Sequence, residues 1–280
     1  MGEKRLMDRF KLCVAVSVLT TLVPFAGALA DWDIGDPALY YQLPSPTGWD
    51  VYSEWGTGPL ASEGYGAADD WTATVTAPIT DIHFWGSWKN DVVGQTGRIL
   101  IQIFSNDTSN PGFPRPDDLQ WSSVVNTDEY TGRLWSSSPT KNQGWYDPRE
   151  SDTWIANEHK KIYQYNINTI DNPFIQQAGQ TYWMMISMDF EGCEWGWKTT
   201  PGVQGNSSVF WDSYNRWGSH DKWWRHPTID WKWTQLSTPQ GYCDPRQPVD
   251  LAFVLTTPEP ATLLLLAAGA AAVLRKRNKK

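Results

Sequence analysis

Closely spaced tryptophans are the residues in this chain whose type and spacing most readily indicate chemistry. Two of the pairs have a single residue between the rings, which places both rings on one face of an extended strand. The candidate rings are Trp195, Trp197, Trp223, Trp224, Trp231 and Trp233. Rings spaced in this way suit stacking on pyranose units, which indicates a polysaccharide platform. The alternative is that they fill a core, where large aromatic side chains pack efficiently.

The sequence contains few residues whose spacing indicates catalysis. A glycosidase requires two carboxyl groups about 5–9 Å apart, and Glu191 and Glu194 are the pair to test first because they border the Trp195 segment. No HExxH pair, GxSxG elbow or P-loop is present. The four histidines occupy no such motif: His83, His159, His220 and His226. We therefore expect no enzyme activity, and the alternative is a secreted jelly-roll glycan hydrolase or lyase.

Cross-links and metals leave two open questions. Cys193 and Cys243 can form a disulfide closing a loop of about 50 residues, although two free thiols are the alternative. Oxygen ligands in turns at Asp69-Asp70 or Asp117-Asp118 would suit structural calcium. Asp pairs in turns are more often caps or solvated charges, so we assign no metal ligand and expect no cofactor.

The N-terminus predicts export. Four basic residues precede or enter an apolar run from Leu12 to Ala28, and Ala28-Leu29-Ala30 fits the small-x-small rule for signal-peptide cleavage. The sequence therefore predicts a helical signal peptide at residues 1–30 and a mature chain that begins at Asp31. The alternative is an uncleaved N-terminal anchor, but Pro24 and Gly27 late in the run favour cleavage.

The C-terminus resembles a short stop-transfer segment. A break at Pro258, Glu259 and Pro260 precedes fourteen uncharged residues, 261–274, and a basic end that begins Arg275, Lys276, Arg277. The apolar helix would reach about 21 Å, short of the roughly 30 Å hydrocarbon layer of a bilayer. We therefore expect residues 258–280 to insert in the membrane transiently and to be processed, and the alternative is a plain tail-anchor helix.

The body between these signals reads as one domain, residues 31–257. It keeps 14 basic and 28 acidic residues, which argues against nucleic-acid binding, and it holds all 19 tryptophans. Apolar residues alternate at 99–104, 182–189 and 249–256, with further strands expected at 71–76, 79–85 and 162–167. Long loops are expected at 106–118, 136–157 and 199–208. The pattern predicts an all-β, two-sheet β-sandwich of jelly-roll type.

Two resemblances extend this interpretation. The order Pro-Glu-Pro, apolar helix and basic cluster resembles the PEP-CTERM sorting signal of bacterial exported proteins. That resemblance implies an exosortase-type processing enzyme as partner, an inner-membrane intermediate, and delivery to the cell surface or exterior. Passages of the body resemble an uncharacterised domain family of exported bacterial proteins, which implies a β-sandwich without an established activity. They are Ala68-Asp69-Asp70-Trp71, 79–88, 180–183, Trp195-Gly196-Trp197-Lys198 and 249–253.

Together these observations predict an exported, non-catalytic protein that is a structural or carbohydrate-associated component of the envelope or extracellular matrix. An extracellular polysaccharide is the expected ligand if the rings are exposed.

Overall fold

The computed structural model describes residues 31–56, 64–109, 111–149, 153–212, 233–239, 241–243 and 245–257. Within these ranges the regular structure is strand, apart from one 3₁₀ turn, Lys89–Asp91 (η1). The all-β prediction is confirmed. In the same ranges no helix is long and apolar enough to cross a membrane. The predicted signal peptide and sorting segment lie outside the described residues.

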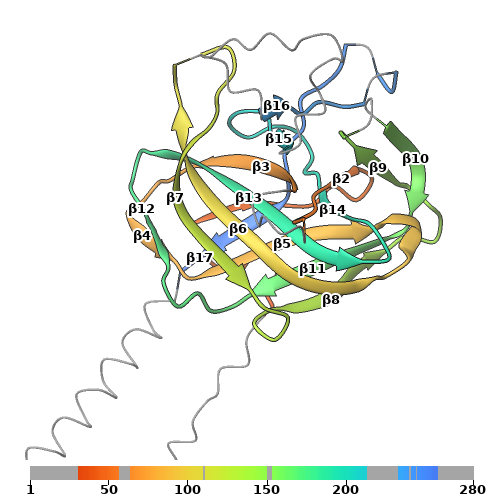
Figure 1. Ribbon diagram of the computed structural model, residues 1–280, viewed down its shortest axis with the longest axis horizontal. Helices are drawn as coiled ribbons and strands as arrows, with labels where there is room; N and C mark the ends of the chain where they lie inside the picture. Colours follow the sequence, from red (N-terminus) through yellow and green to blue (C-terminus); the bar gives the residue numbers. More distant parts are fainter. Residues whose placement is uncertain are drawn as a thin grey trace, which may run out of the picture. The chain divides into compact units, whose positions relative to one another are not determined.

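The strands form two large sheets and one small one (Figure 1). The nine-stranded sheet, called sheet A, contains β1 (Tyr40–Gln42), β2 (Trp49–Tyr52), β5 (Asp81–Trp88), β8 (Thr131–Ser137), β9 (Gln143–Asp147), β10 (Thr153–His159), β11 (Lys161–Ile167), β14 (Trp195–Lys198) and β17 (Phe253–Thr256). The six-stranded sheet, called sheet B, contains β3 (Tyr65–Thr72), β6 (Gln95–Asp107), β7 (Arg115–Val125), β13 (Thr181–Glu191), β15 (Val209–Asp212) and β16 (Trp233–Gln235). The small sheet pairs β4 (Ala77–Ile79) with β12 (Phe174–Gln176).

Strand β5 organises sheet A. It pairs with β11 along one edge, and its other edge is shared by β17 and then β14. Phe84 lies opposite Phe253, and Trp88 lies opposite Trp195. Gly86 lets the strands approach closely, because a Cβ at this position would lie 2.3 Å from the Trp195 ring. Gly86 therefore leaves room for the Trp195 ring to pack against β5.

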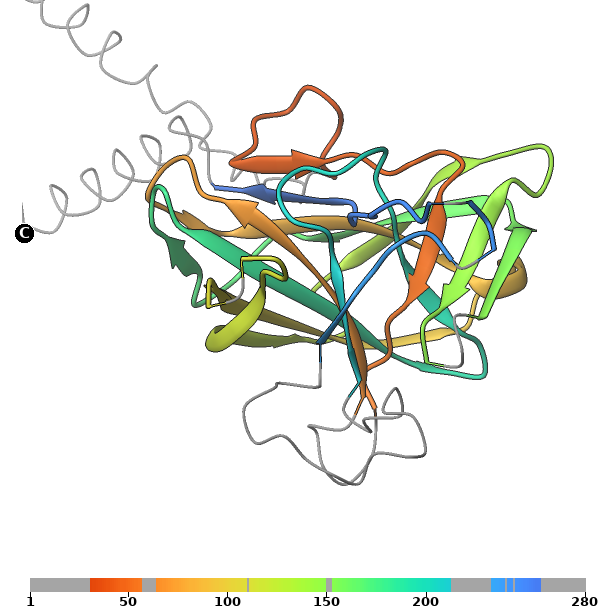
Figure 2. The ribbon, with the colours of Figure 1, turned by 90° about the horizontal axis from the view of Figure 1, so that it is seen from above.

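The main hydrophobic core lies between the two sheets, whose layered arrangement is visible in Figure 2. Alternating side chains of β6 and β13 supply much of it, including Ile101, Ile103, Met184 and Ile186, all fully buried. Seven tryptophans are less than 2 % exposed: Trp71, Trp85, Trp88, Trp145, Trp183, Trp195 and Trp197. The structure is therefore sandwich-like, and the jelly-roll connectivity stays a prediction.

Several boundaries differ from the predicted ones. Residues 77 and 78, which separate the strands expected at 71–76 and 79–85, belong to strand β4, and the loop expected over 136–157 contains β9 and β10. Strand β4 pairs only with β12, in a two-stranded sheet where every strand is an edge and a proline is tolerated. Strand β9 is buried throughout and runs parallel to β2, so it shows none of the alternation of a half-exposed strand.

Candidate functional site

The predicted aromatic platform is corrected by the structure at three positions. Trp195 and Trp197 do share one face of β14, but that face is the core and both rings are fully buried. Trp195 packs edge-on against Phe84 and Trp197 against Phe253. Trp233 is 9 % exposed and packs in a separate cluster. The other three candidates, Trp223, Trp224 and Trp231, lie outside the described residues, as do His220 and His226.

The rings of β14 are buried because of the position of the strand. Strand β14 lies between β5 and β2 in the interior of sheet A, with all four of its residues buried. The spacing of Trp195 and Trp197 correctly predicts a shared face, but spacing alone cannot tell a core face from a solvent face.

The candidate acid pair does not form a matched pair of carboxyl groups. Glu194 Oε2 binds Lys89, and its Oε1 is 2.8 Å from Nη2 of Arg149, so both oxygens already accept from cations. Glu191 is exposed at the end of β13. Arg149 also stacks on the ring of Tyr52, 3.4 Å from its centroid. Glu194 thus belongs to a surface ion-pair network.

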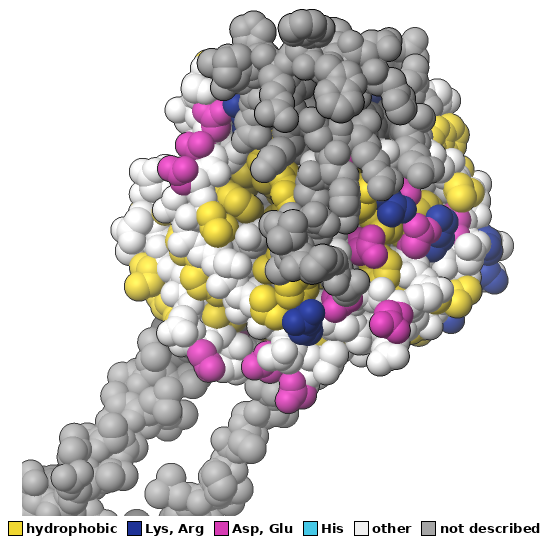
Figure 3. Space-filling view, in the orientation of Figure 1, with side chains coloured by type: hydrophobic (Ala, Val, Ile, Leu, Met, Phe, Trp, Pro, Cys, Tyr) yellow, Lys and Arg dark blue, Asp and Glu magenta, His cyan; other side chains and the backbone are white. Residues whose placement is uncertain are grey.

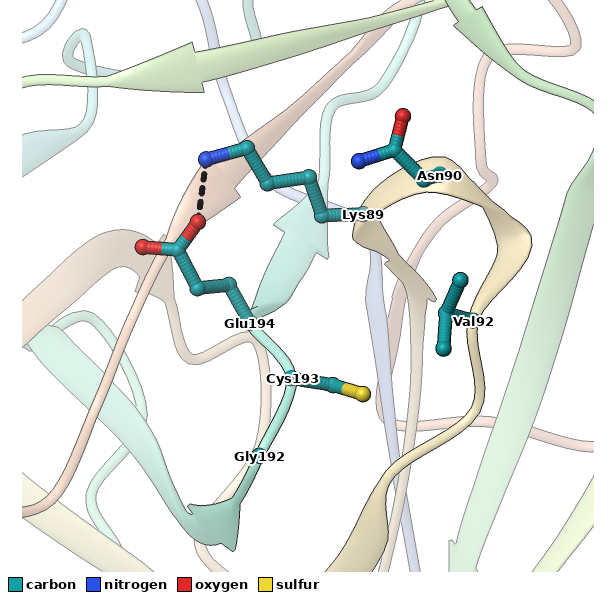
Figure 4. A pocket seen from close by; sticks show the side chains of 6 residues that line it. All are labelled: Lys89, Asn90, Val92, Gly192, Cys193 and Glu194. Carbon is teal, nitrogen blue, oxygen red and sulfur yellow. Dashed lines mark hydrogen bonds and ion pairs between the residues drawn. The ribbon is translucent and has the colours of Figure 1, made fainter.

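A pocket of about 330 Å³ lies beside this network (Figure 4). Its walls come from η1 and from the turn between β13 and β14, and it is lined by Lys89, Asn90, Val92, Gly192, Cys193 and Glu194. The Lys89–Glu194 pair spans one side, and the Cys193 thiol points away from that pair.

The predicted disulfide is absent, because Cys193 and Cys243 are both free thiols. Cys193 lines the pocket, whereas Cys243 Sγ is 2.9 Å from Oγ1 of Thr238 within its own loop. Each sulfur is therefore directed to local neighbours rather than toward the other.

Among the described side chains visible in Figure 3, the charged ones do not gather into one patch. Acidic side chains are spread around the periphery of this face, basic ones lie among them, and hydrophobic ones are interrupted by other groups. The acidic excess of the body is therefore dispersed on this face, as expected for a solvated surface.

A more specific arrangement lies inside the protein. Asp50 on β2 and Lys198 on β14 are directly opposite in register, with Asp50 Oδ2 2.8 Å from Lys198 Nζ. The same oxygen is 2.8 Å from His159 Nε2, and His159 Nδ1 is 2.8 Å from Oε2 of Glu158. The Lys198 ammonium also donates to Gln143 Oε1. We call Asp50, Glu158, His159 and Lys198 the mixed cluster, and none of the four is more than 3 % exposed.

The contacts of His159 determine its charge. Both ring nitrogens face carboxylate oxygens, which only accept when ionised. Each nitrogen therefore carries a proton and the ring is cationic. The mixed cluster thus contains two anions and two cations. A buried charge set of this kind is tolerable because each member is paired and hydrogen-bonded.

The pKa shifts of the mixed cluster follow from burial and pairing. Burial lowers the pKa of His159, but Asp50 and Glu158 outweigh burial and raise it above its ordinary value. Burial raises the pKa of Asp50, but the charges of Lys198 and His159 outweigh it and hold the pKa below the usual range. Burial lowers the pKa of Lys198 despite the attraction of Asp50.

A second buried set, Asp69, Asp70 and Asp250, is called the acid cluster. Asp69 Oδ2 accepts from the backbone N–H of Leu251 at 2.6 Å. This bond joins β3 to the segment just before β17. Asp70 Oδ1 accepts from the backbone N–H of Asn206 at 2.9 Å, and its Oδ2 accepts from the amide of that residue at 2.8 Å. These bonds tie three distant segments together.

The acid cluster consists of carboxyl groups alone. Among the described residues, no basic side chain pairs with any of its three carboxyl groups. Burial raises the pKa of Asp70 to about 6 and that of Asp250 to about 7. The pKa of Asp69 is raised well above its ordinary value by burial and by the charge of Asp250.

The metal prediction finds little support at these sites. Within the described ranges, no three His, Cys, Asp or Glu side chains are arranged to hold a metal ion. The Asp69 and Asp70 oxygens accept from amide donors, and Asp117 and Asp118 are exposed on β7. The expectation of no cofactor, with structural calcium left unassigned, therefore stays a prediction.

Residues 38–256 match the family model described as "Domain of unknown function (DUF7901)". The chain belongs to this family. Residues 256–278 match the model described as the PEP-CTERM protein-sorting motif. The searches of curated proteins and of solved structures found no match.

The sorting motif establishes how this DUF7901 protein travels. It is an exported protein that passes through the membrane to the cell surface. Its motif is of the kind that exosortase-type processing enzymes recognise. The resemblance stated for the tail and that stated for the body are both confirmed. The motif residues themselves, Pro258, Glu259, Pro260, Arg275, Lys276 and Arg277, lie outside the described residues.

The passages that carry the resemblance meet inside the DUF7901 domain. Asp69 of the first passage accepts from Leu251 of the last, and Gly86 packs under Trp195. Lys198, at the end of Trp-Gly-Trp-Lys, is fully buried in the mixed cluster. Sequence reasoning missed the mixed cluster, although a lysine ending an aromatic strand was a usable signal.

Proposed function

We propose that this DUF7901 protein is a non-catalytic structural component of the cell envelope or extracellular matrix. The observation that carries the proposal is that its aromatic residues are used for packing. Seven tryptophans are less than 2 % exposed, so the ring content of the described domain serves mainly as core. Export through the PEP-CTERM motif is consistent with a durable module that functions outside the cell.

The test compares a buried ring with an exposed ring. Trp195→Ala should lower the free energy of unfolding by about 3–5 kcal/mol, as large-to-small core changes do, without altering retention on polysaccharide affinity gels. Tyr242, 52 % exposed, is the matched surface aromatic, and Tyr242→Ala should change stability little. Loss of polysaccharide retention in a still-folded Trp195→Ala protein would contradict the structural role.

The non-catalytic part of the proposal has a separate test. The purified protein is incubated with extracellular polysaccharides, and new reducing ends and unsaturated products are measured. We expect neither product. Formation of either product by the wild type, and its loss in Glu194→Gln, would support the alternative of a jelly-roll glycan hydrolase or lyase.

A carbohydrate-associated role is the second candidate, and one observation favours it. The half-exposed ring of Tyr242 is held edge-on against Trp49 and Trp154, with centroids 4.8 and 5.8 Å away. A ring oriented in this way can stack on a sugar. Reduced polysaccharide retention by Tyr242→Ala, with unchanged stability, would favour this role.

A further inference from the structure

The Lys198–Asp50 pair of the mixed cluster holds an amine and a carboxylate in direct contact, as amide formation between them would require. The residues face each other on neighbouring antiparallel strands, and their side chains are fully buried. The amine nitrogen lies 2.8 Å from a carboxylate oxygen. Intramolecular reactions between groups held in this way reach effective molarities of about 10⁵–10⁸ M. Amide formation, unfavourable between free amines and acids in water, becomes accessible under these conditions.

We propose that Lys198 and Asp50 condense to form an intramolecular amide that cross-links β14 to β2. The new bond joins Lys198 Nζ to Asp50 Cγ, and the bond between Cγ and Oδ2 breaks. An ammonium and a carboxylate become one neutral amide and one water molecule. The reaction needs no oxidant or other co-reactant.

The neighbouring groups suit each proton transfer. The Lys198 ammonium first passes a proton to Asp50 Oδ2 along their 2.8 Å contact, and burial, which lowers the pKa of Lys198, favours the neutral amine. The amine then attacks Cγ. His159 donates its Nε2 proton to Oδ2, which leaves as water, and recovers a proton from the new amide nitrogen. The imidazolium is thereby restored.

The remaining contacts assign the leaving oxygen. Asp50 Oδ2 accepts from both Lys198 and His159, whereas Asp50 Oδ1 has no hydrogen-bond partner among the described residues. Oδ2 is therefore the oxygen placed to leave, and Oδ1 becomes the amide carbonyl. Gln143 holds the amine by accepting from it, and Glu158 holds the imidazole through Nδ1.

The bond would replace an ion pair that is costly to bury. It would also supply the covalent cross-link that the free cysteines do not. The inference deepens the proposed structural role, but it is tested separately, because its readout is a mass and does not depend on polysaccharide retention.

The experiment is intact-mass spectrometry of the purified, denatured full chain, followed by peptide mapping. We expect a mass lower than that of the sequence by one water molecule, and a branched peptide joining the segments that contain Lys198 and Asp50. A folded wild-type protein with its full sequence mass would overturn the proposal, whatever the variants show.

Two variants give matched controls. Lys198→Arg keeps the positive charge but lacks the amine, so it should keep its full mass. A water loss that persists in this variant would assign the dehydration to another residue and contradict the cross-link. Asp50→Asn should condense with loss of ammonia, which yields the same cross-linked mass as the wild type. His159→Gln should lower the cross-linked fraction, and an unchanged fraction would remove His159 from the reaction.

Discussion

The mixed cluster and the acid cluster bury the same kind of group in opposite ways. Asp50 is surrounded by cations and its pKa is held below the usual range, whereas Asp250 faces other carboxyl groups and burial raises its pKa to about 7. Both side chains belong to fully buried residues of the same domain. Burial alone therefore does not decide the charge of an aspartate in this protein, and the partner residues do.

The difference has a consequence for stability. Members of the mixed cluster contribute to stability while they are ionised and paired. Members of the acid cluster contribute while they hold their protons, because ionisation would place like charges together without a cation. Substitutions in the two clusters should therefore change stability in opposite directions.

The largest effect is expected for Lys198→Met, which leaves Asp50 buried without its main cation and also removes the amine of the proposed cross-link. Breaking a buried pair in this way costs about 3–5 kcal/mol of unfolding free energy, measured by urea denaturation. The matched control is Lys89→Met, whose ion pair with Glu194 is partly exposed and should contribute less than about 1 kcal/mol. Equal losses in the two variants would show that the mixed cluster carries no special weight.

A smaller loss is expected for Glu158→Gln. The substitution keeps the shape of the side chain but removes the charge that faces Nδ1 of His159. Losing a charge-assisted hydrogen bond should cost about 1.5–3 kcal/mol. Glu158 orients the imidazole in the proposed amide reaction, so the loss is compared between protein samples with the same cross-linked fraction by mass. A Glu158→Gln protein as stable as the wild type would show that His159 does not need two anions.

The isosteric change in the acid cluster should have the opposite sign. Asp250→Asn removes a buried charge and keeps an oxygen that can accept from the backbone N–H of Gln204. At pH 8 we expect a gain of about 1–2 kcal/mol, a value reduced for partial solvent screening. Asp118→Asn on exposed β7 is the control and should stay within about 0.5 kcal/mol of the wild type. Destabilisation by Asp250→Asn would show that Asp250 is ionised and compensated.

The part of this account that the sequence predicts is local. Strand β6 alternates because one of its faces is buried, and the alternation locates it correctly. The predicted ranges 162–167 and 182–189 also fall within β11 and β13, although β13 is buried on both faces from Tyr182 to Met188. The sorting motif is likewise a contiguous signal. Strand β14 is buried on both faces, so the spacing of its tryptophans does not show whether either face is accessible to a sugar.

The clusters escaped prediction because their members are far apart in the chain. Asp50 and Lys198 are separated by 148 positions, and His159 joins them from a third strand. Contacts between residues so far apart in the chain leave no local pattern in the sequence. Only strand register brings Lys198 opposite Asp50, and register follows from the whole sheet.

The pH dependence of unfolding tests the contrast most directly. Asp250 has an unfolded pKa near 3.8 and a folded pKa of about 7, so in that window the native state holds a proton that the unfolded chain has lost. Stability must then fall as pH rises. The raised pKa of His159 acts in the same direction above its unfolded value of 6.5.

The decisive measurement is the free energy of unfolding of the wild type and of Asp250→Asn at intervals from pH 5 to pH 8. The account predicts that the wild type loses stability across this range and that Asp250→Asn loses clearly less. A wild type that gains stability as pH rises, or two parallel curves, would contradict the assignment of a protonated acid cluster.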